Sequence, residues 1–491
     1  MSYTQLDMSQ YNGAMSEKYW NLWNPAVQAK IDRDIEANRK ADAIFAVNAA
    51  PGTEVLVEQL SHDFIFGAHI FNFDQLGSDD ANAKYKALYG SLFNSATISF
   101  YWRELELEEG HPRFRPEYRD SAEFWNNCPN PKEQPHWRRP ATDPVVDFCL
   151  SKGIRLHGHT LVWGNNTWQW PEWLVRRIPL KFLRNADFEF TNQGLKTYAL
   201  YKILGDMSPD EIADAYPKFA DDLNVLMAKR IIEIANRYGD KVDSWDVVNE
   251  SADDYNAGFI LPEKRLCKSG YGPMPGDYTY RGFKLAETFF PKKVKFNIND
   301  YHLEKYYMEQ VRELKGRGCK IDIMGAQMHL FNPQYLLDLA NGVRDDIQTP
   351  EQMYKTFGTL AQAETPIHLS EITITSPNND ERGQAIQAVV ARNLYRIWFS
   401  LKPMMGITWW NVVDDCGAPG EPSVSGLFSR KMDPKPSYFV LDDLINHQWK
   451  TRLETTVGKD GHLHFRGFRG NYRLTWKNAD GSTQTSTTHL A

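Results

Sequence analysis

Two carboxylic acids that each end or interrupt an apolar segment are the residues of this sequence best suited to chemistry. Glu250 follows Asn249 at the end of "SWDVVNES" (244–251), and Glu371 lies inside "PIHLSEITI" (366–374). A buried carboxylate is costly unless it is paired or has a chemical task. Hydrolysis of a glycosidic bond needs such a pair, with one acid that donates a proton and one ionised group that attacks the sugar. For either glutamate alone, an ion pair at a strand end remains the alternative.

Eight short apolar segments are the elements that would position these side chains. They alternate with longer amphipathic segments such as 221–239 and 381–401, and strand–helix alternation indicates a parallel sheet. Eight repeats predict an α/β fold of the closed (β/α)8 TIM-barrel type. The predicted strands are 64–70, 95–102, 154–163, 242–250, 294–300, 321–330, 366–374 and 405–415.

The C-terminal ends of the predicted strands carry most of the polar candidates, and the active sites of such barrels lie at that end. The residues there are His159, Asn249, Glu250, Asn299, Asp300, Gln327, His329, Glu371, Trp410 and Asp414. Glu250 and Glu371 belong to the fourth and seventh strands, so they can face each other across a substrate. A separation of about 5–5.5 Å between the two carboxyl groups would retain the anomeric configuration, and a wider one would invert it. We expect Asn249 to bind a sugar 2-hydroxyl and His329 to orient the nucleophile.

Both flanks of the predicted barrel show β-type patterns. Residues 43–60 alternate around a Pro-Gly turn and residues 453–482 contain two Asp-Gly turn signals, so each predicts a β-hairpin. We expect the flanks to form one small accessory antiparallel β module. The predicted domains are an N-terminal helix and β-hairpin flank (1–60), the catalytic barrel (61–448) and a C-terminal β-rich flank (449–491).

The composition limits the classes of partner and the cellular compartment that we expect. The chain has 491 residues, a net charge of −7 and 42% hydrophobic residues, which argues against nucleic acid or anionic membranes as main partners. Five scattered cysteines indicate neither a disulfide framework nor a zinc site. His157 and His159 lack a third ligand at suitable spacing, so we expect no metal and no cofactor. Without a membrane-length apolar run or an apolar signal core, we expect a cytoplasmic protein, or a secreted or periplasmic one if a signal peptide was removed.

Several motifs in order resemble the family 10 glycoside hydrolases, best known as endo-β-1,4-xylanases. The motifs are "GHTLVW" (158–163), "WDVVNE" (245–250), "NDY" (299–301), "GAQMH" (325–329), "LSEITI" (369–374), "TWWNVVDD" (408–415) and "DPKPSY" (433–438), within roughly residues 60–448. The resemblance implies a retaining endo-β-1,4-glycosidase that degrades xylan-type plant polysaccharide, with Glu250 as acid/base and Glu371 as nucleophile. The substrate-binding residues that it implies are His159, Trp163, Asn249, Asn299, Tyr301, Gln327, His329 and Trp410.

The sequence departs from the family pattern at two places. The second strand of the family usually ends in a Glu-Asn-Glu-Met-Lys-Trp type sequence that holds the next sugar, whereas "TISFYW" (97–102) keeps only Trp102. Gly164 stands where the family usually has His. Each lost hydrogen bond to a sugar is worth on the order of 1 kcal/mol, so recognition beyond the cleavage point is expected to differ. Phe100 and Tyr101 either stack on a different sugar ring or pack in the core.

Two further hypotheses therefore stand beside the xylanase-like one. In the first, the same mechanism acts on another β-linked glycan, an oligosaccharide or a plant glycoside. The second belongs to another class, a catalytically silent carbohydrate-binding protein whose C-terminal β-rich region docks onto glycan.

Overall fold

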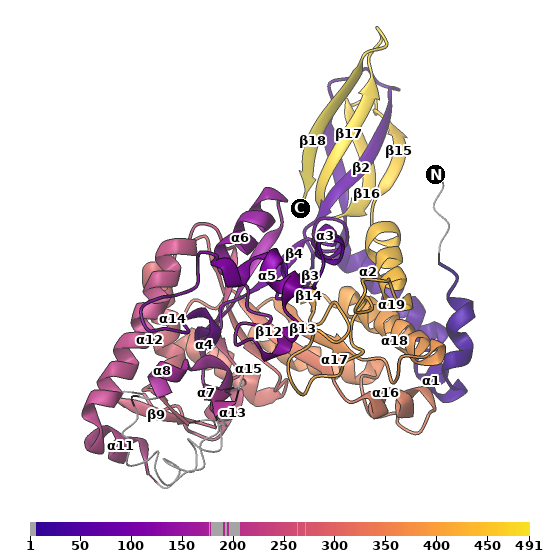
Figure 1. Ribbon diagram of the computed structural model, residues 1–491. Coiled ribbons are helices and arrows are strands. Elements are labelled where there is room, and N and C mark those ends of the chain that lie inside the picture. Colours follow the sequence, from indigo (N-terminus) through magenta and orange to yellow (C-terminus); the bar gives the residue numbers. More distant parts are fainter. Residues whose placement is uncertain are drawn as a thin grey trace.

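The centre of the protein, described here from a computed structural model, is a closed barrel of eight parallel strands (Figure 1). The structure describes residues 6–175, 177, 190–191, 194–195, 207–262, 264–270 and 272–491. The barrel strands are β3 (Ile65–His69), β4 (Ser95–Ser99), β5 (Arg155–Trp163), β8 (Ser244–Asn249), β11 (Lys295–Asp300), β12 (Ile323–Leu330), β13 (Ile367–Ile374) and β14 (Met404–Trp409). Pairing of β14 with β3 closes the barrel. The predicted TIM-barrel fold and its eight predicted strands are confirmed.

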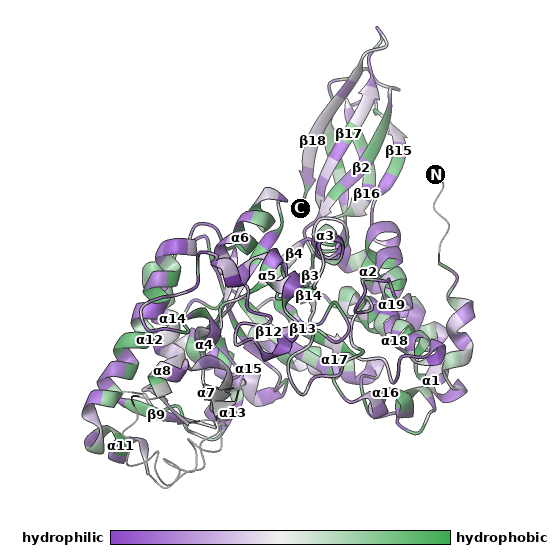
Figure 2. Cartoon of the chain, viewed as in Figure 1, coloured by the Kyte–Doolittle hydropathy of each residue, from purple (hydrophilic) through white to green (hydrophobic). Residues whose placement is uncertain are grey.

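The barrel strands are apolar along their length because helices cover their outer face and side chains fill the interior. All eight residues of β13 are buried. The predicted amphipathic segments form α12 (Pro217–Tyr238) and α18 (Glu381–Ser400), and the Asp380 side chain caps α18 by accepting a hydrogen bond from the Gly383 amide. Figure 2 shows both hydrophobic and hydrophilic residues on these outer helices, as expected for helices with one buried face.

The remaining described elements are mostly helices that surround the barrel or lie in its loops. The longer ones are α2 (Pro25–Arg39), α3 (Asp79–Ala87), α6 (Thr142–Ser151), α14 (Tyr278–Phe289), α15 (Lys305–Gly316), α16 (Pro333–Ala340), α17 (Pro350–Leu360) and α19 (Pro436–Asp442). The shorter ones are η1 (Met8–Ala14), α1 (Glu17–Leu22), α4 (Trp102–Leu105), η2 (Tyr118–Asp120), α5 (Ala122–Asn127), η3 (Pro131–Glu133), α7 (Asn166–Gln169), α8 (Glu172–Val175), α11 (Pro209–Ala215), α13 (Ala252–Asn256), η4 (Ala361–Ala363) and η5 (Asp443–Gln448). Two small antiparallel strand pairs are also present, β6 (Phe190–Thr191) with β7 (Gly194–Leu195) and β9 (Leu266–Ser269) with β10 (Gly272–Pro275).

The two flanks of the chain form one antiparallel module that projects from the barrel (Figure 1). Its four-stranded sheet has the order β15 (Arg452–Thr456), β2 (Glu54–His62), β17 (Gly470–Lys477) and β18 (Thr483–Leu490), and its second sheet pairs β1 (Lys40–Ala46) with β16 (His462–Phe468). The predicted joint module is therefore confirmed. Side chains of both sheets, including Phe45, Val57 and Leu474, share a separate hydrophobic core.

The prediction of a hairpin over residues 43–60 is wrong. The two strands on either side of the Pro51-Gly52 turn pair with different C-terminal strands, β1 with β16 and β2 with β15 and β17. Of the two Asp-Gly signals in 453–482, only Asp480-Gly481 connects paired neighbours, β17 and β18. Period-two alternation identifies the buried face of each strand, but not its partner, and burial between two sheets favours a change of sheet at the turn.

The module and the barrel are joined by packing at their boundary. The Trp449 ring stacks on Phe399 of α18 with 4.1 Å between centroids, and Arg39 donates hydrogen bonds to the carbonyls of Phe399 and Leu401. Division of the chain at residues 60 and 448 stays a prediction. In the parts of the chain that the structure describes, no helix is long and apolar enough to cross a membrane.

Candidate active site

A cavity of about 840 Å³ lies at the C-terminal ends of the barrel strands and contains both predicted catalytic carboxyl groups. Seven of the ten predicted site residues line it: Trp163, Glu250, Tyr301, Gln327, His329, Glu371 and Trp410. Tyr301 lies at the rim and is 45% exposed. The other three, His159, Asn249 and Asn299, are buried beneath the cavity surface. All ten residues thus lie in or directly under one cavity, although they come from five barrel strands and from the loops after β8, β11 and β14.

Glu250 is held in an unusual backbone conformation at the end of β8. Its φ of 52° lies in the left-handed region, which non-glycine residues adopt rarely and at a cost of about 1–3 kcal/mol. Its amide donates a 2.7 Å hydrogen bond to the Asn299 carbonyl on the neighbouring β11. The turn directs the Glu250 side chain toward the cavity instead of continuing the strand.

Two side chains donate hydrogen bonds to the Glu250 carboxylate. Gln327 Nε2 lies 3.0 Å from Oε1 and Trp163 Nε1 lies 3.0 Å from Oε2. Both donors favour the charged form, but burial, followed by the charge of Glu371, outweighs them and raises the pKa of Glu250 to about 7. Glu250 therefore keeps a proton in neutral solution far more often than an ordinary glutamate.

Glu371 is surrounded by groups that donate hydrogen bonds or carry positive charge. Asn299 Nδ2 donates to its Oε1 at 2.8 Å, and His329 Nε2 lies 3.4 Å from its Oε2. The Thr373 hydroxyl lies 2.9 Å from the other nitrogen of His329, Nδ1. If Thr373 donates there, the His329 proton is on Nε2 and points at Glu371. These contacts hold both oxygens of the Glu371 carboxyl group in place.

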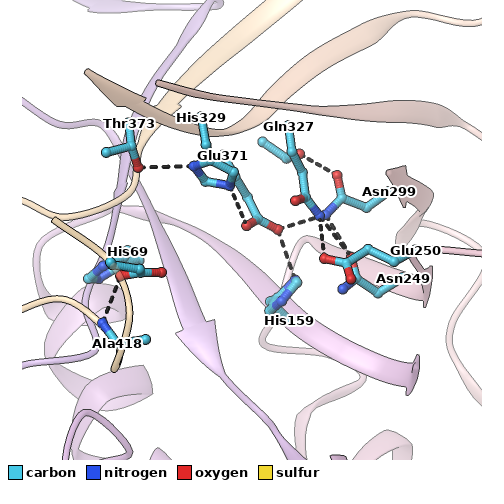
Figure 3. Close-up of polar contacts among 12 residues, drawn as sticks. His69, His159, Asn249, Glu250, Asn299, Gln327, His329, Glu371, Thr373 and Ala418 are labelled. Atoms are coloured by element: carbon cyan, nitrogen blue, oxygen red, sulfur yellow. Dashed lines mark hydrogen bonds and ion pairs between the residues drawn. The ribbon is translucent and has the colours of Figure 1, made fainter. Parts of the chain in front are cut away.

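A chain of amide side chains links the two carboxyl groups (Figure 3). Asn299 Nδ2 contacts both Glu371 Oε1 and Asn249 Oδ1 at 2.8 Å, and Gln327 Nε2 lies 3.5 Å from that same Asn249 oxygen. Gly325 on β12 makes room for this arrangement, because a Cβ there would lie 2.5 Å from Asn299 Oδ1. Among the described residues, the buried Asn249 Nδ2 has no hydrogen-bond partner, so a donor beside Glu250 is left for another molecule.

His157 and His159 share one acceptor beneath the cavity, the carboxylate of Asp246. His157 Nε2 and His159 Nδ1 each lie 2.8 Å from Asp246 Oδ2. Burial alone would raise the pKa of Asp246, but the charges and hydrogen bonds of the two histidines hold it below its usual value. Burial disfavours the charge on His159, yet its hydrogen bond to Asp246 and the charge of Glu371 raise its pKa. His159 Nδ1, 3.9 Å from Glu371 Oε1, thus places positive charge near that carboxylate.

The altered second strand contributes one aromatic residue to the cavity. Tyr101 lines it, whereas Phe100 is fully buried against Tyr238 and Trp245. Of the two possibilities for these residues, Phe100 thus packs in the core and Tyr101 lies at the site. The Tyr101 ring contacts those of His159 and Trp163 at centroid distances of 5.2 and 5.7 Å.

Four charged residues that the sequence did not single out also line the cavity: Arg138, Arg139, Glu304 and Glu421. The two arginines belong to a Pro-rich loop (126–144) without periodicity, so nothing in their pattern predicted burial. Two adjacent arginines before a proline are the only signal that marks this position.

The second departure, Gly164, has a steric reason. A Cβ at Gly164 would lie 2.9 Å from the Cβ of Ser269 on β9, and the Ser269 hydroxyl donates a 3.0 Å hydrogen bond to the Gly164 carbonyl. The space that a larger side chain would need next to Trp163 is therefore occupied by the β9–β10 hairpin.

Comparison with known proteins gives a match to one family. The family model described as "Glycosyl hydrolase family 10" matches residues 81–444. Endo-1,4-beta-xylanase A of Thermoanaerobacterium saccharolyticum is 25% identical over 61% of this chain and 22% of its own length. Exoglucanase XynX of Acetivibrio thermocellus is 25% identical over 61% of this chain and 24% of its own length. The chain thus spans about a quarter of the length of these curated relatives.

Among solved structures, xylanase 10B from Thermotoga petrophila, determined in complex with xylobiose, is similar to the chain in fold. It has a TM-score of 0.50 and 17% sequence identity, covering 79% of this chain and 95% of that one.

Proposed function

The chain belongs to glycosyl hydrolase family 10. On this basis we propose that it hydrolyses internal bonds of β-1,4-linked plant polysaccharide of the xylan type, with retention of the anomeric configuration. One observation carries the proposal: Glu250 and Glu371 line the same cavity, and burial together with the charge of Glu371 raises the pKa of Glu250 to about 7. A carboxyl group with a raised pKa beside a second carboxyl group is suited to act as the acid.

In the proposed first step, a carboxylate oxygen of Glu371 attacks the anomeric carbon while the bond from that carbon to the leaving oxygen breaks. The leaving oxygen takes the proton of Glu250, and the sugar is left as an ester on Glu371. In the second step, Glu250, now ionised, removes a proton from water, and the water oxygen displaces Glu371 from the anomeric carbon. Two displacements at the same carbon give net retention.

The neighbouring groups support these roles. Gln327 and Trp163 fix both oxygens of Glu250, and Asn299 fixes Glu371, so neither carboxyl group has to be reoriented during the reaction. The unpaired Asn249 Nδ2 is proposed to donate to the sugar 2-hydroxyl, a contact that strengthens in the transition state. The charge of His159 stabilises the ionised nucleophile before attack and after its release.

A second candidate function keeps this chemistry and changes the glycan. The observation that favours it is the cavity wall near β4, which is lined by Tyr101, Arg138 and Arg139. The family pattern would have acidic, amide and Lys side chains at the end of this strand. The substrate would then be another β-linked glycan, an oligosaccharide or a plant glycoside.

The proposal is tested by release of sugars from unsubstituted β-1,4-xylan, with product lengths resolved, for the wild type and Glu371→Ala in parallel. We expect short xylo-oligosaccharides from the wild type only. Near-normal hydrolysis by Glu371→Ala would exclude the assigned nucleophile. Absence of release by both proteins, with turnover of another β-glycan by the wild type alone, would favour the second candidate.

A further inference from the structure

Arg138 and Arg139 are two adjacent, buried arginines that line the same cavity as Glu250 and Glu371. Their exposed fractions are 3% and 8%. A guanidinium group carries five N–H donors and keeps its charge in proteins. Burying it is costly unless those donors and that charge are satisfied. The mechanism proposed above uses neither residue, so their burial needs another explanation.

Arg138 has few partners for its donors. Its Nη2 donates to Asn411 Oδ1 at 3.1 Å and lies 3.5 Å from His69 Nε2, and its buried Nε has no partner among the described residues. The nearest carboxylate oxygen, Glu421 Oε2, is 3.8 Å from Nη2, beyond hydrogen-bond distance. That oxygen already accepts hydrogen bonds from Asn411 Nδ2 and the Ala418 amide. Glu421 therefore offsets part of the charge of Arg138 and leaves its donors available.

Arg139 likewise has few partners for its N–H donors. Its Nη1 donates to the Arg138 carbonyl at 3.0 Å, whereas its Nε is buried and unpartnered within the described part of the chain. Glu104 Oε2 lies 3.8 Å from this Nε, and Glu104 is shared with Arg103, whose Nη1 lies 3.9 Å from Oε1. Burial lowers the pKa of Arg139 despite these contacts, as expected for an incompletely compensated charge.

The fold holds both guanidinium groups in place before any ligand arrives. Arg138 has a left-handed φ of 62°, and its amide donates to Gln75 Oε1 at 2.7 Å. The Arg139 carbonyl accepts a hydrogen bond from Arg113 at 3.1 Å. The Arg139 guanidinium lies over the Tyr101 ring, 3.9 Å from its centroid. Since Tyr101 contacts Trp163, and Trp163 donates to Glu250, two aromatic rings connect Arg139 to the catalytic Glu250.

We propose that Arg138 and Arg139 form a subsite for the carboxylate of a uronic acid. This uronic acid is either the sugar next to the one whose glycosidic bond is cleaved, or a branch on that neighbouring sugar. A carboxylate supplies both the negative charge and the several acceptor sites that two guanidinium groups lack here. A neutral sugar hydroxyl would accept one hydrogen bond and leave the charge uncompensated. The inference rests on the proposed glycosidase function and narrows its substrate to an acidic β-linked glycan.

The test is a binding experiment that does not depend on turnover. Glu371→Ala protein is titrated calorimetrically with oligosaccharides of glucuronoxylan that carry a uronosyl branch, and with the same oligosaccharides after reduction of the carboxyl group to a hydroxymethyl group. A third ligand, an oligomer of β-1,4-linked glucuronic acid, distinguishes a uronic acid in the main chain from one on a branch. We expect carboxyl reduction to weaken binding about 10- to 100-fold, the range for hydrogen bonds to charged groups.

Arginine variants assign the effect to the subsite. Arg138→Met and Arg139→Met, each in the Glu371→Ala background, are expected to weaken binding of the acidic ligand by a similar factor and to leave the reduced ligand nearly unaffected. Arg138→Lys and Arg139→Lys, which keep the charge, are expected to restore part of the affinity. The matched control is Arg466→Met on β16 of the β module. It removes an arginine that is paired with Glu36 of α2 and Asp42 of β1. Thermal unfolding of each variant verifies that it is folded.

The outcomes separate this inference from the proposed function. Equal affinity of the parent protein for acidic and reduced ligands would overturn the carboxylate subsite and leave the glycosidase assignment intact. No binding of any of the three acidic or reduced ligands would also overturn it, while hydrolysis of xylan by the wild type still decides the function separately. Arginine-dependent binding of acidic ligands without hydrolysis by the wild type would support the subsite and contradict the glycosidase function.

Discussion

Glu250 and Glu371 are the same residue type in one cavity, and their neighbours account for the different roles that we propose for them. Glu250 receives two hydrogen bonds from neutral donors, whereas Glu371 has Asn299 at one oxygen and His329 at the other, with the charge of His159 nearby. Because the negative charge of Glu371 also raises the pKa of Glu250, the nucleophile helps to keep the acid protonated.

The raised pKa of Glu250 predicts the pH dependence of catalysis. The acid must be protonated to assist departure of the leaving oxygen, so kcat/KM should fall as the pH rises through about 7. The measurement is kcat/KM against pH on a glycan substrate. A dinitrophenyl glycoside is the control, since its leaving group needs no proton and the alkaline decrease should be reduced. An alkaline decrease centred near the ordinary glutamate pKa, about 4.3, would contradict the assignment.

The elements of the barrel position these side chains through contacts between neighbouring strands. Asn299 on β11 contacts Asn249 on β8 and Glu371 on β13, and Gln327 on β12 contacts Glu250. A polar network of amide side chains at the strand ends thus fixes both carboxyl groups. Such rigid positioning is what a two-step displacement at one carbon requires.

Asn299→Ala tests this network. We expect kcat to fall about 10- to 100-fold, because removal of one hydrogen bond to a charged group costs about 1.5–3 kcal/mol. KM should change little, since Asn299 is buried and does not line the cavity. The matched control is Asn297→Ala on the same strand, whose side chain is buried without a partner among the described residues. An equal loss of kcat in both variants would indicate a general effect on the strand and contradict a positioning role.

Gly164→Ala tests the close contact between β5 and the β9–β10 hairpin. The added Cβ would lie 2.9 Å from the Ser269 Cβ, so we expect the free energy of unfolding to fall by about 1–3 kcal/mol. Denaturant unfolding measures this change. Adding Ser269→Gly should make the double variant more stable than the sum of the two single effects predicts. Additive effects would show that the two residues do not compete for space.

The parts of the fold that could be predicted from the sequence are those where local pattern and burial coincide. The strands of a parallel barrel are buried on both sides, so they read as continuous apolar segments, and polar residues at their ends mark the cavity. Glu250 and Glu371 were identifiable for this reason. The pairing of strands in the β module could not be predicted, because the alternation of residues 43–60 identifies only the buried face of each strand. Arg138 and Arg139 were missed because their burial depends on distant residues such as Gln75 and Glu104.

At the scale of the whole molecule, the two ends of the chain depend on each other. The N-terminal strand β2 lies between β15 and β17, and β16 is the partner of β1 among the described strands. Val55 and Val57 on β2 are fully buried against residues of the C-terminal flank. The N-terminal flank therefore has no complete hydrophobic core of its own, and its sheet edges are covered only when residues after 448 are present.

Truncation after Gln448 tests this dependence. We expect a protein that aggregates or unfolds at clearly lower temperature. The strands β1 and β2 would lose all the partners that they have in the described part of the chain, and the stack of Trp449 on Phe399 would also be lost. A chain ending after Lys477 is the control: it lacks β18, the edge strand, and keeps the neighbours of β2. Thermal unfolding and size-exclusion chromatography distinguish the two. Equal stability of both truncated proteins and the full chain would contradict the interdependence.

The most direct test of the central claim is covalent trapping of the nucleophile. The wild type is incubated with an activated 2-deoxy-2-fluoro-β-xylobioside, after turnover of the parent aryl β-xylobioside has been established, and is analysed by intact mass and peptide mapping. We predict a mass increase of one 2-deoxy-2-fluoroxylobiosyl group located on Glu371, and no mass increase in Glu371→Ala. Continued turnover of the parent glycoside with no adduct, or an adduct on Glu250 or another carboxyl group, would contradict the account.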